Sequence, residues 1–214
     1  FPDKSKKYYL NALEKAKNNQ DNLGYAKAMF RLGTIYAFKG DWIGAKPYFE
    51  KAFKIQKKID DIKGVIDSLC GLGETYTMLG DFSKALKKYK KAKKIAIELD
   101  DEIILSDVLS GMGKLYYVFG KFKKSISLHQ KVLEVAKKSE NTSLITHSLH
   151  GIATCHLQSH EVNEGIKVLD EILINSKRLG NTSDTAYTYG HISEAYAQKN
   201  DFKMAHLNID KSLR

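Results

Sequence analysis

The chain has 214 residues, of which 43% are hydrophobic and 28% are charged, and its formal net charge is +10. Only Arg31, Arg178 and Arg214 among its 35 basic residues are arginine. Because bidentate recognition of phosphate or guanine favours the arginine fork, the lysine excess argues against nucleic acid as a partner of this segment.

No run of the sequence approaches the roughly 20 apolar residues that a membrane-spanning helix needs, and no signal sequence is visible. Cys70 and Cys155 lie far apart in the chain and are expected to be buried free thiols. Free thiols favour a reducing compartment, so we expect a cytoplasmic protein; an extracytoplasmic sensor remains an alternative.

The chain is built on a pattern that returns every forty residues and is clearest over residues 61–100. Val65, Leu69, Leu72 and Tyr76 follow one another at steps of four and three, which places them on one side of a helix. The second half of the unit repeats this spacing from Ala85 onward. Each unit is therefore predicted to be a helical hairpin with two apolar stripes.

The units follow one another along the whole chain. Residues 1–20 match a second half alone, complete units cover 21–60, 61–100, 101–140 and 141–180, and residues 181–214 form a partial unit. Because neither helix of a hairpin can bury its stripe alone, copies must stack. The sequence predicts one all-α solenoid over residues 1–214, and its incomplete outer units indicate a fragment of a longer protein.

Local signals mark the expected helix boundaries. The first helices are predicted to begin after capping residues, and the turns before the second helices contain glycine in most units. Pro47 falls inside a predicted second helix, where we expect a kink or a delayed helix start. The capping residues of the first helices are Asp21, Asp61, Asp101, Asn141 and Asn181.

These residues resemble a known family, the tetratricopeptide repeat. Its signature, W-x-x-L-G-x-x-Y followed by A-x-x-x-F, is matched in type and spacing. The second complete unit reads Leu69-x-x-Leu72-Gly73-x-x-Tyr76 and then Ala85-x-x-x-Tyr89. The period of 40 is similar to the long-repeat branch found in Leu-Gly-Asn-type scaffolds, kinesin light chains and Rap-type sensors. The resemblance implies a right-handed superhelix of antiparallel helix hairpins.

The glycines of the signature have a structural explanation. Gly33, Gly73 and Gly113 are expected on the helix face that a neighbouring helix approaches closely, where a Cβ would push it away. The unit at 141–180 departs from the pattern, and two interpretations stay open: a hinge or ligand-shaped gap, and ordinary drift. The departures are Ala153, His156, His160 and Gly165.

The resemblance also implies where a partner would bind, because in this family the first helices line a concave groove. The positions that the packing stripe leaves free in those helices are the candidate site. They are Lys27, Phe30, Arg31, Thr34, Asp67, Glu74, Asp107, Ser110, Lys114, His147, His150, Tyr187, His191 and Glu194.

The charges of these positions constrain the partner. Some members of the family grip a C-terminal carboxylate with clustered basic residues, but here acidic residues such as Asp67 and Asp107 interrupt any such cluster. We therefore expect a protein or peptide segment of mixed charge, and no carboxylate clamp. Association of the chain with itself stays open.

Histidine is concentrated in the second half of the chain, where all seven copies follow residue 128. His147, His150 and His191 make a metal site conceivable, but no acidic residue or cysteine completes the set at ligand-like spacing, so we expect no metal and no cofactor. A groove sensitive to pH is the alternative.

The sequence contains no nucleophile elbow, phosphate-binding glycine loop, paired-histidine zinc motif or kinase signature. We therefore expect a binding scaffold and no enzyme, since phosphatase activity of the Rap type would need a helical bundle that is missing here. The alternative is a ligand- or peptide-sensing segment of a bacterial signalling protein, a histidine kinase or transcription regulator, whose output domain lies outside this fragment.

Overall fold

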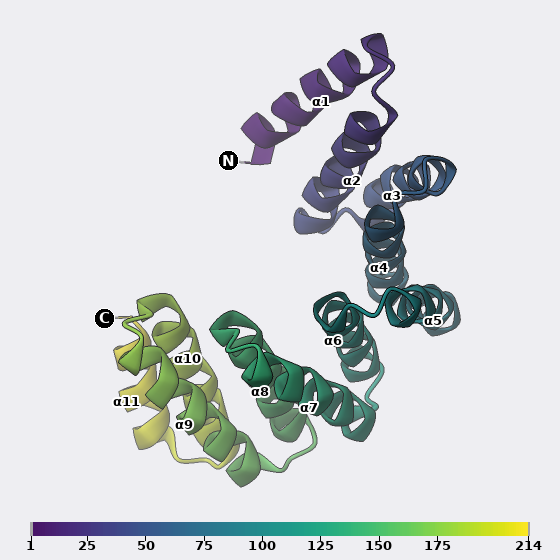
Figure 1. Ribbon diagram of the computed structural model, residues 1–214. Coiled ribbons are helices and arrows are strands. Elements are labelled where there is room, and N and C mark those ends of the chain that lie inside the picture. Colours follow the sequence, from purple (N-terminus) through teal and green to yellow (C-terminus); the bar gives the residue numbers. More distant parts are fainter. Residues whose placement is uncertain (1, 214) are drawn as a thin grey trace. The chain divides into compact units, whose positions relative to one another are not determined.

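The structure is a computed structural model that describes residues 2–213, and these residues form eleven α-helices and no strand (Figure 1). The helices are α1 (Pro2–Asn18), α2 (Asn22–Phe38), α3 (Trp42–Lys58), α4 (Ile62–Met78), α5 (Phe82–Glu98), α6 (Glu102–Val118), α7 (Phe122–Lys138), α8 (Thr142–Gln158), α9 (Val162–Arg178), α10 (Thr182–Gln198) and α11 (Phe202–Ser212). The helix pairs recur every forty residues, as the sequence predicted. The fold is an all-α solenoid of helix hairpins.

The helices group into two compact units, one of residues 1–115 and one of residues 116–214, and the division falls inside α6. We call them unit 1 and unit 2. In unit 1, α2 packs on α3 and α4 packs on α5, while α3 and α2 both contact α4 (Figure 1). In unit 2, each of the helices α7 to α11 packs on the next. A single array over residues 1–214 stays a prediction.

Capping and turn residues explain where the helices begin and end. The Asp21 Oδ1 atom accepts a hydrogen bond from the Gly24 amide at 2.8 Å, and the equivalent bond from Gly44 to Asp41 is also 2.8 Å. Gly80 has φ +79°, the left-handed conformation that ends a helix and favours glycine. The second helices end in the same conformation mostly without glycine, for example at Asp60 (φ 54°).

Pro47 does not delay the start of its helix. Asp41 caps α3, the helix begins at Trp42 as its counterparts begin at Phe82 and Phe122, and Pro47 lies inside it. The expectation of a delayed start was therefore wrong. The well-formed cap and the burial of Phe49 further along the helix hold α3 in register, although Pro47 offers no amide hydrogen to the helix.

The signature glycines Gly33 and Gly73 lie where a neighbouring helix approaches closely, as expected, and the part of that helix that they admit is an aromatic ring. A Cβ on Gly33 would lie 2.9 Å from the ring of Phe49, and a Cβ on Gly71 would meet the same ring at 2.9 Å. Tyr89 fills the corresponding space at Gly73 and Gly111. Each ring comes from a second helix and is wedged between two first helices, so the glycines set the distance between hairpins.

The forty-residue repeat at residues 141–180 has a filled core. Leu157 and Leu169 are almost fully buried and belong to one cluster with Ile172 and Ile192. A Cβ on Gly165 would lie 2.6 Å from the Leu157 Cδ2 atom, so the small residue compensates for the large one. This local compensation agrees with drift under a constant core volume.

Candidate functional site

Each first helix leaves one stripe of side chains outside the core. After Asn22 at its first position, the exposed residues of α2 recur at steps of four and three, the spacing of one helix face. They are Leu23, Lys27, Arg31, Thr34 and Phe38. In α4 and α6 fewer residues are exposed at the equivalent positions. We call the stripes of α2, α4 and α6 up to residue 115 the first-helix face of unit 1.

The predicted site residues of unit 1 all lie on this face. Lys27, Arg31 and Thr34 of α2 are exposed, as are Asp67 of α4 and the α6 pair Asp107 and Lys114. Phe30, Glu74 and Ser110 are half-buried. Phe30 was expected to lie outside the packing stripe, but its ring packs on that of Phe49 at 5.4 Å, and the Ser110 Oγ atom is buried. The other seven side chains are accessible to a partner.

Positive and negative side chains occupy different helices of this face. Lys27 and Arg31 place positive charge on α2, whereas Asp67 and Asp107 place negative charge on α4 and α6. Partial burial, followed by the nearby carboxylate of Asp107, raises the pKa of Asp67, and the charge of Arg31 acts in the opposite direction. The two carboxylates are therefore close enough to repel each other.

One turn further along the same helices, a cation and an anion of the face form an ion pair with each other. The Lys114 Nζ atom lies 2.5 Å from the Glu74 Oε1 atom, which joins α6 to α4. Beneath them, burial raises the pKa of the Cys70 thiol to about 12, and the surrounding carboxylates act in the same direction. Cys70 is thus a thiol at neutral pH and not a reactive thiolate.

Unit 2 presents an aromatic and histidine cluster on α8 and α10. The His150 ring lies 5.0 Å from that of Tyr187 and 5.8 Å from that of His191, between ring centroids. Neither ring nitrogen of His150 has a hydrogen-bond partner among the described residues. Burial, followed by the charges of His191 and His147, lowers the pKa of His150 to about 4, so its imidazole is neutral at pH 7.

The remaining predicted residues of unit 2 surround this cluster. His147 is exposed, and its ring lies 6.2 Å from that of His129 on α7. Tyr187 is 60% exposed although it belongs to the cluster. The His191 Nδ1 atom lies 3.6 Å from Glu194 Oε2 in the next turn. Within each unit, the candidate residues therefore lie close to one another on one surface of that unit.

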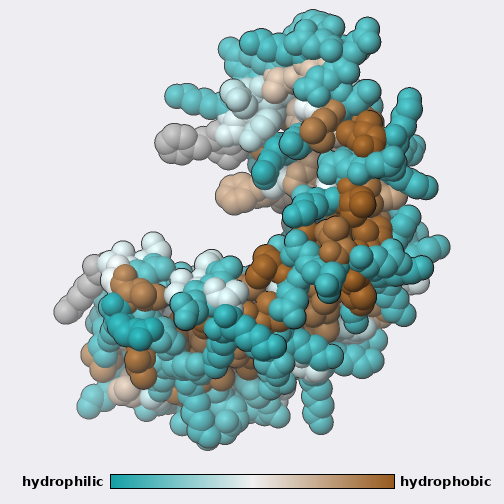
Figure 2. Space-filling model, in the orientation of Figure 1, coloured by the Kyte–Doolittle hydropathy of each residue, from teal (hydrophilic) through white to brown (hydrophobic). Residues whose placement is uncertain are grey.

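Sequence analysis missed two exposed apolar residues on the same stripes. Phe38 ends α2 and is 83% exposed, and Met78 ends α4 and is 45% exposed. They continue the spacing of Thr34 and Glu74 by one helical turn, which is the signal that could have found them. Figure 2 shows that hydrophilic side chains cover most of the visible surface, with apolar ones gathered over α3, α4 and α5.

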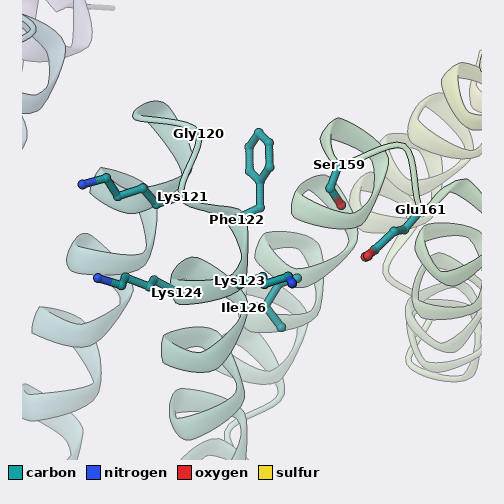
Figure 3. Close-up of a pocket in the computed structure, with 8 residues that line it drawn as sticks. All are labelled: Gly120, Lys121, Phe122, Lys123, Lys124, Ile126, Ser159 and Glu161. Atoms are coloured by element: carbon teal, nitrogen blue, oxygen red, sulfur yellow. The ribbon is translucent and has the colours of Figure 1, made fainter.

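A cavity of 410 Å³ lies in unit 2, at the turns before α7 and α9. Phe122, Ile126, Ser159 and Glu161 are among the residues that line it. In Figure 3 Lys121 and Lys124, which also border it, point away from Ser159 and Glu161. None of the predicted site residues borders the cavity, so it is separate from the first-helix surfaces.

Within residues 2–213, no cluster of three or more histidine, cysteine, aspartate or glutamate side chains has a geometry that could hold a metal ion. None of the helices described here combines the length and apolar character required to cross a membrane.

Stacked helix hairpins with accessible first-helix stripes define a helical repeat protein. The tetratricopeptide repeat family matches residues 26–98 and 64–138, which together span more than half of the chain. The chain therefore belongs to the tetratricopeptide repeat family, whose fold is generally a scaffold for protein interactions. No curated protein sequence matches the chain.

Solved structures show the same fold at low sequence identity. BtubC (BKLC) from P. vanneervenii is 16% identical, with a TM-score of 0.80 over 100% of this chain and 90% of that one. Aspartyl phosphate phosphatase F from Bacillus subtilis is 17% identical, with a TM-score of 0.78 over 94% of this chain and 53% of that one. A Rap protein complexed with Competence and Sporulation Factor is 12% identical, with a TM-score of 0.73 over 97% and 68%.

Proposed function

We propose that this chain is a non-catalytic scaffold that recognises a protein or peptide segment on its first-helix faces. The observation that carries the proposal is the exposure of large side chains there. Phe38 is 83% exposed and Tyr187 is 60% exposed, on helices whose opposite sides are densely packed. Aromatic side chains are enriched at the centres of protein interfaces relative to the rest of the surface.

The proposed partner segment carries both charges. The cations of α2 and the carboxylates of α4 and α6 exclude a partner of one sign, and the carboxylates disfavour a C-terminal carboxylate clamp. Nucleic acid is disfavoured as well, because phosphates would meet Asp67 and Asp107. We place the protein in the cytoplasm, in keeping with its free thiols.

A sensing role in a bacterial signalling protein is the second candidate. The solved Rap protein with the same fold is complexed with Competence and Sporulation Factor, which favours this alternative. In that case the output domain would be encoded outside these residues. The sequence of the complete gene decides between the two candidates.

The scaffold proposal is tested by charge reversal. The double variant Asp67→Lys and Asp107→Lys should change which peptides the chain selects from a random displayed library, while its circular dichroism stays unchanged. Glu98→Lys, an exposed reversal in α5 outside the face, is the control for a charge reversal elsewhere on the surface. The control variant should select the same peptides as the parent chain. If the double variant also selects those peptides, the first-helix face of unit 1 is not the binding surface.

A further inference from the structure

The second helices of unit 1 carry a strongly basic side. Helix α5 has seven lysines and one acidic residue, Glu98, and α3 has five lysines and one acidic residue, Glu50. Most of the exposed lysines follow one another at steps of three and four, which places them on one side of each helix. We call six of them the lysine face: Lys51, Lys54 and Lys58 of α3, and Lys87, Lys90 and Lys91 of α5.

Contacts between side chains join the two helices into one face. The Lys91 Nζ atom of α5 lies 5.0 Å from the ring centroid of Phe53, which belongs to α3. The Nζ atoms of Lys46 in α3 and Lys84 in α5 lie 5.6 Å and 5.7 Å from the centroid of one ring, that of Tyr76 in α4. Figure 1 shows α3 and α5 on the same side of α4. A broad partner can therefore meet the lysines of both helices at once.

The charge of the lysine face is not neutralised by the nearby carboxylates. Glu50, Asp81 and Glu98 each pair with a lysine outside this set, at 2.6–3.8 Å. The six lysines themselves have no ion pair with any residue that the structure describes. Burial lowers the pKa of the adjoining Lys88, Glu50 opposes that shift, and two neighbouring lysines of α5 add to it. An anion brought close to this face is therefore stabilising.

The residue types of the face favour a lipid surface over nucleic acid or an acidic protein segment. Helices α3 and α5 contain no arginine, the residue that directional binding of phosphate and bases favours. Ile43 and Pro47 continue the stripe of Lys51 towards the start of α3, and Ile43 is 76% exposed. An isoleucine beside lysines can enter the boundary between headgroups and acyl chains, whereas an acidic segment offers it mainly charged neighbours. Clusters of about four to eight lysines on an amphipathic helix are typical of binding to anionic lipids.

We propose that the lysine face docks on the surface of a bilayer that contains anionic phospholipid, with Ile43 at the level of the headgroups. The lysines hold the protein there by their attraction to the headgroup charges. This role goes beyond recognition of a protein segment and uses other helices. The first-helix face of unit 1 therefore stays free while the lysine face is occupied, and unit 1 brings a bound segment to a membrane surface.

Sedimentation of the full chain with lipid vesicles tests the proposal. Vesicles of phosphatidylcholine with one-quarter phosphatidylserine should bind the chain, whereas vesicles of phosphatidylcholine alone should leave it in solution. Binding should weaken as the salt concentration rises, because ions screen the attraction between exposed charges. The proposal is wrong if the phosphatidylserine vesicles bind no more of the chain at low salt than the neutral vesicles do.

Variants locate the contact on the chain. Lys87→Gln with Lys90→Gln should weaken binding to the phosphatidylserine vesicles about 25-fold, since each lysine near an anionic surface contributes about fivefold. Lys138→Gln with Lys203→Gln, at exposed positions of unit 2, changes the net charge equally and should bind as the parent chain does. Circular dichroism should show the same helicity for both pairs. Equal weakening by the two pairs, or no weakening by the first, would overturn the assignment to the lysine face.

The variant Ile43→Ser distinguishes a bilayer from negative charge alone. Removal of the exposed isoleucine should weaken vesicle binding about fivefold, because less apolar surface leaves water. Unchanged binding would contradict the position of Ile43 at the headgroups. A decaglutamate peptide or a single-stranded oligonucleotide that binds more tightly than the vesicles, at equal concentration of negative charge, would identify a different class of partner and overturn the proposal. Peptide selection by the first-helix face should be the same in all these variants, so the proposed function is tested separately.

Discussion

In unit 1, the aromatic rings of the second helices occupy space that glycines of the first helices leave open. Phe49 lies against Gly33 and Gly71, and Tyr89 fills the next such space. In unit 2 the position of these rings is taken by His129, whose Nε2 atom would be 2.5 Å from a Cβ on Gly151. Packing of this kind makes each residue depend on its neighbours in other helices.

Two glycines of unit 2 should respond in opposite ways to alanine. Gly151→Ala should lower the free energy of unfolding by about 1 kcal/mol or more, because the new Cβ meets the buried ring of His129. Gly190→Ala should raise it by about 0.5–1 kcal/mol, because nothing lies within 4 Å and alanine favours the helix. Chemical denaturation measures both, and equal effects of the same sign would contradict the ring-wedge explanation.

His129 should make unit 2 sensitive to acid. Burial, followed by the charge of His147, lowers its pKa to about 4. The unfolded imidazole, with a pKa of about 6.5, binds a proton first, so stability should fall as the pH drops from about 6.5 to 4, by roughly 3 kcal/mol. Burial also lowers the pKa of the half-buried His150 to about 4, which adds a further loss in the same direction.

The variant His129→Phe checks this assignment by denaturation at a series of pH values. Phenylalanine fills the same position in unit 1, as Phe49, and does not titrate. The variant should lose the share of the pH dependence that His129 contributes and gain stability at pH 7, because the buried His129 Nδ1 atom has no hydrogen-bond partner within residues 2–213. His206→Phe, at an exposed site in α11, should keep the dependence.

At the scale of helices, capping distinguishes the second helices from one another. The carboxylates of Asp41, Asp81 and Asp201 accept hydrogen bonds from the first turn of their helices. Lys121 and Glu161 occupy the same position before α7 and α9 and make no such side-chain bond. At the start of α7 the Lys124 amide donates to the Lys121 backbone carbonyl at 3.0 Å instead, and the lysine side chain there opposes the helix dipole.

Lys121→Asp should stabilise unit 2 by about 1 kcal/mol, because the carboxylate can accept the bond that the lysine cannot. The gain should appear as a higher denaturation midpoint and slower amide exchange in the first turn of α7. Lys121→Ser, which caps without negative charge, separates the hydrogen bond from the dipole. A loss of stability with both variants would show that the existing contacts of Lys121 outweigh a cap.

At the scale of the whole molecule, each unit has its own core. In unit 1 it includes Leu32, Leu69 and Leu72, and in unit 2 Leu149, Leu169 and Ile192. Stability in repeat proteins is roughly a sum of repeat and nearest-neighbour contributions, so distant repeats respond little to a local change. The chain should therefore open in parts.

Gly151→Ala offers a test at this scale. Amide hydrogen exchange should accelerate in α7 and α8, where the ring and the glycine meet, and in α9, which packs on α8. Protection of α2 and α3 should stay unchanged. Mass spectrometry of peptic fragments resolves these segments. A uniform loss of protection from α2 to α10 would instead indicate one cooperative body.

The candidate site was predictable only in part. Spacing alone placed Arg31, Asp67 and Tyr187 outside the packing stripes, and all three are exposed. Phe38 and Met78 were not predicted, although they continue the spacing of Thr34 and Glu74 by one helical turn and are exposed. Proximity of Asp67 to Asp107, and of His150 to His191, depends on how successive helices are stacked, which spacing within one helix does not specify.

The sequence by itself determined the helices and their repetition. Apolar periodicity, capping aspartates and turn glycines are local signals, and they act within one hairpin. Only the tertiary structure showed that Phe49 and Tyr89 are the groups for which the glycines make room, and that Pro47 is held inside an intact α3. Contacts between hairpins decided these points, because residues forty apart in the chain become neighbours only after stacking.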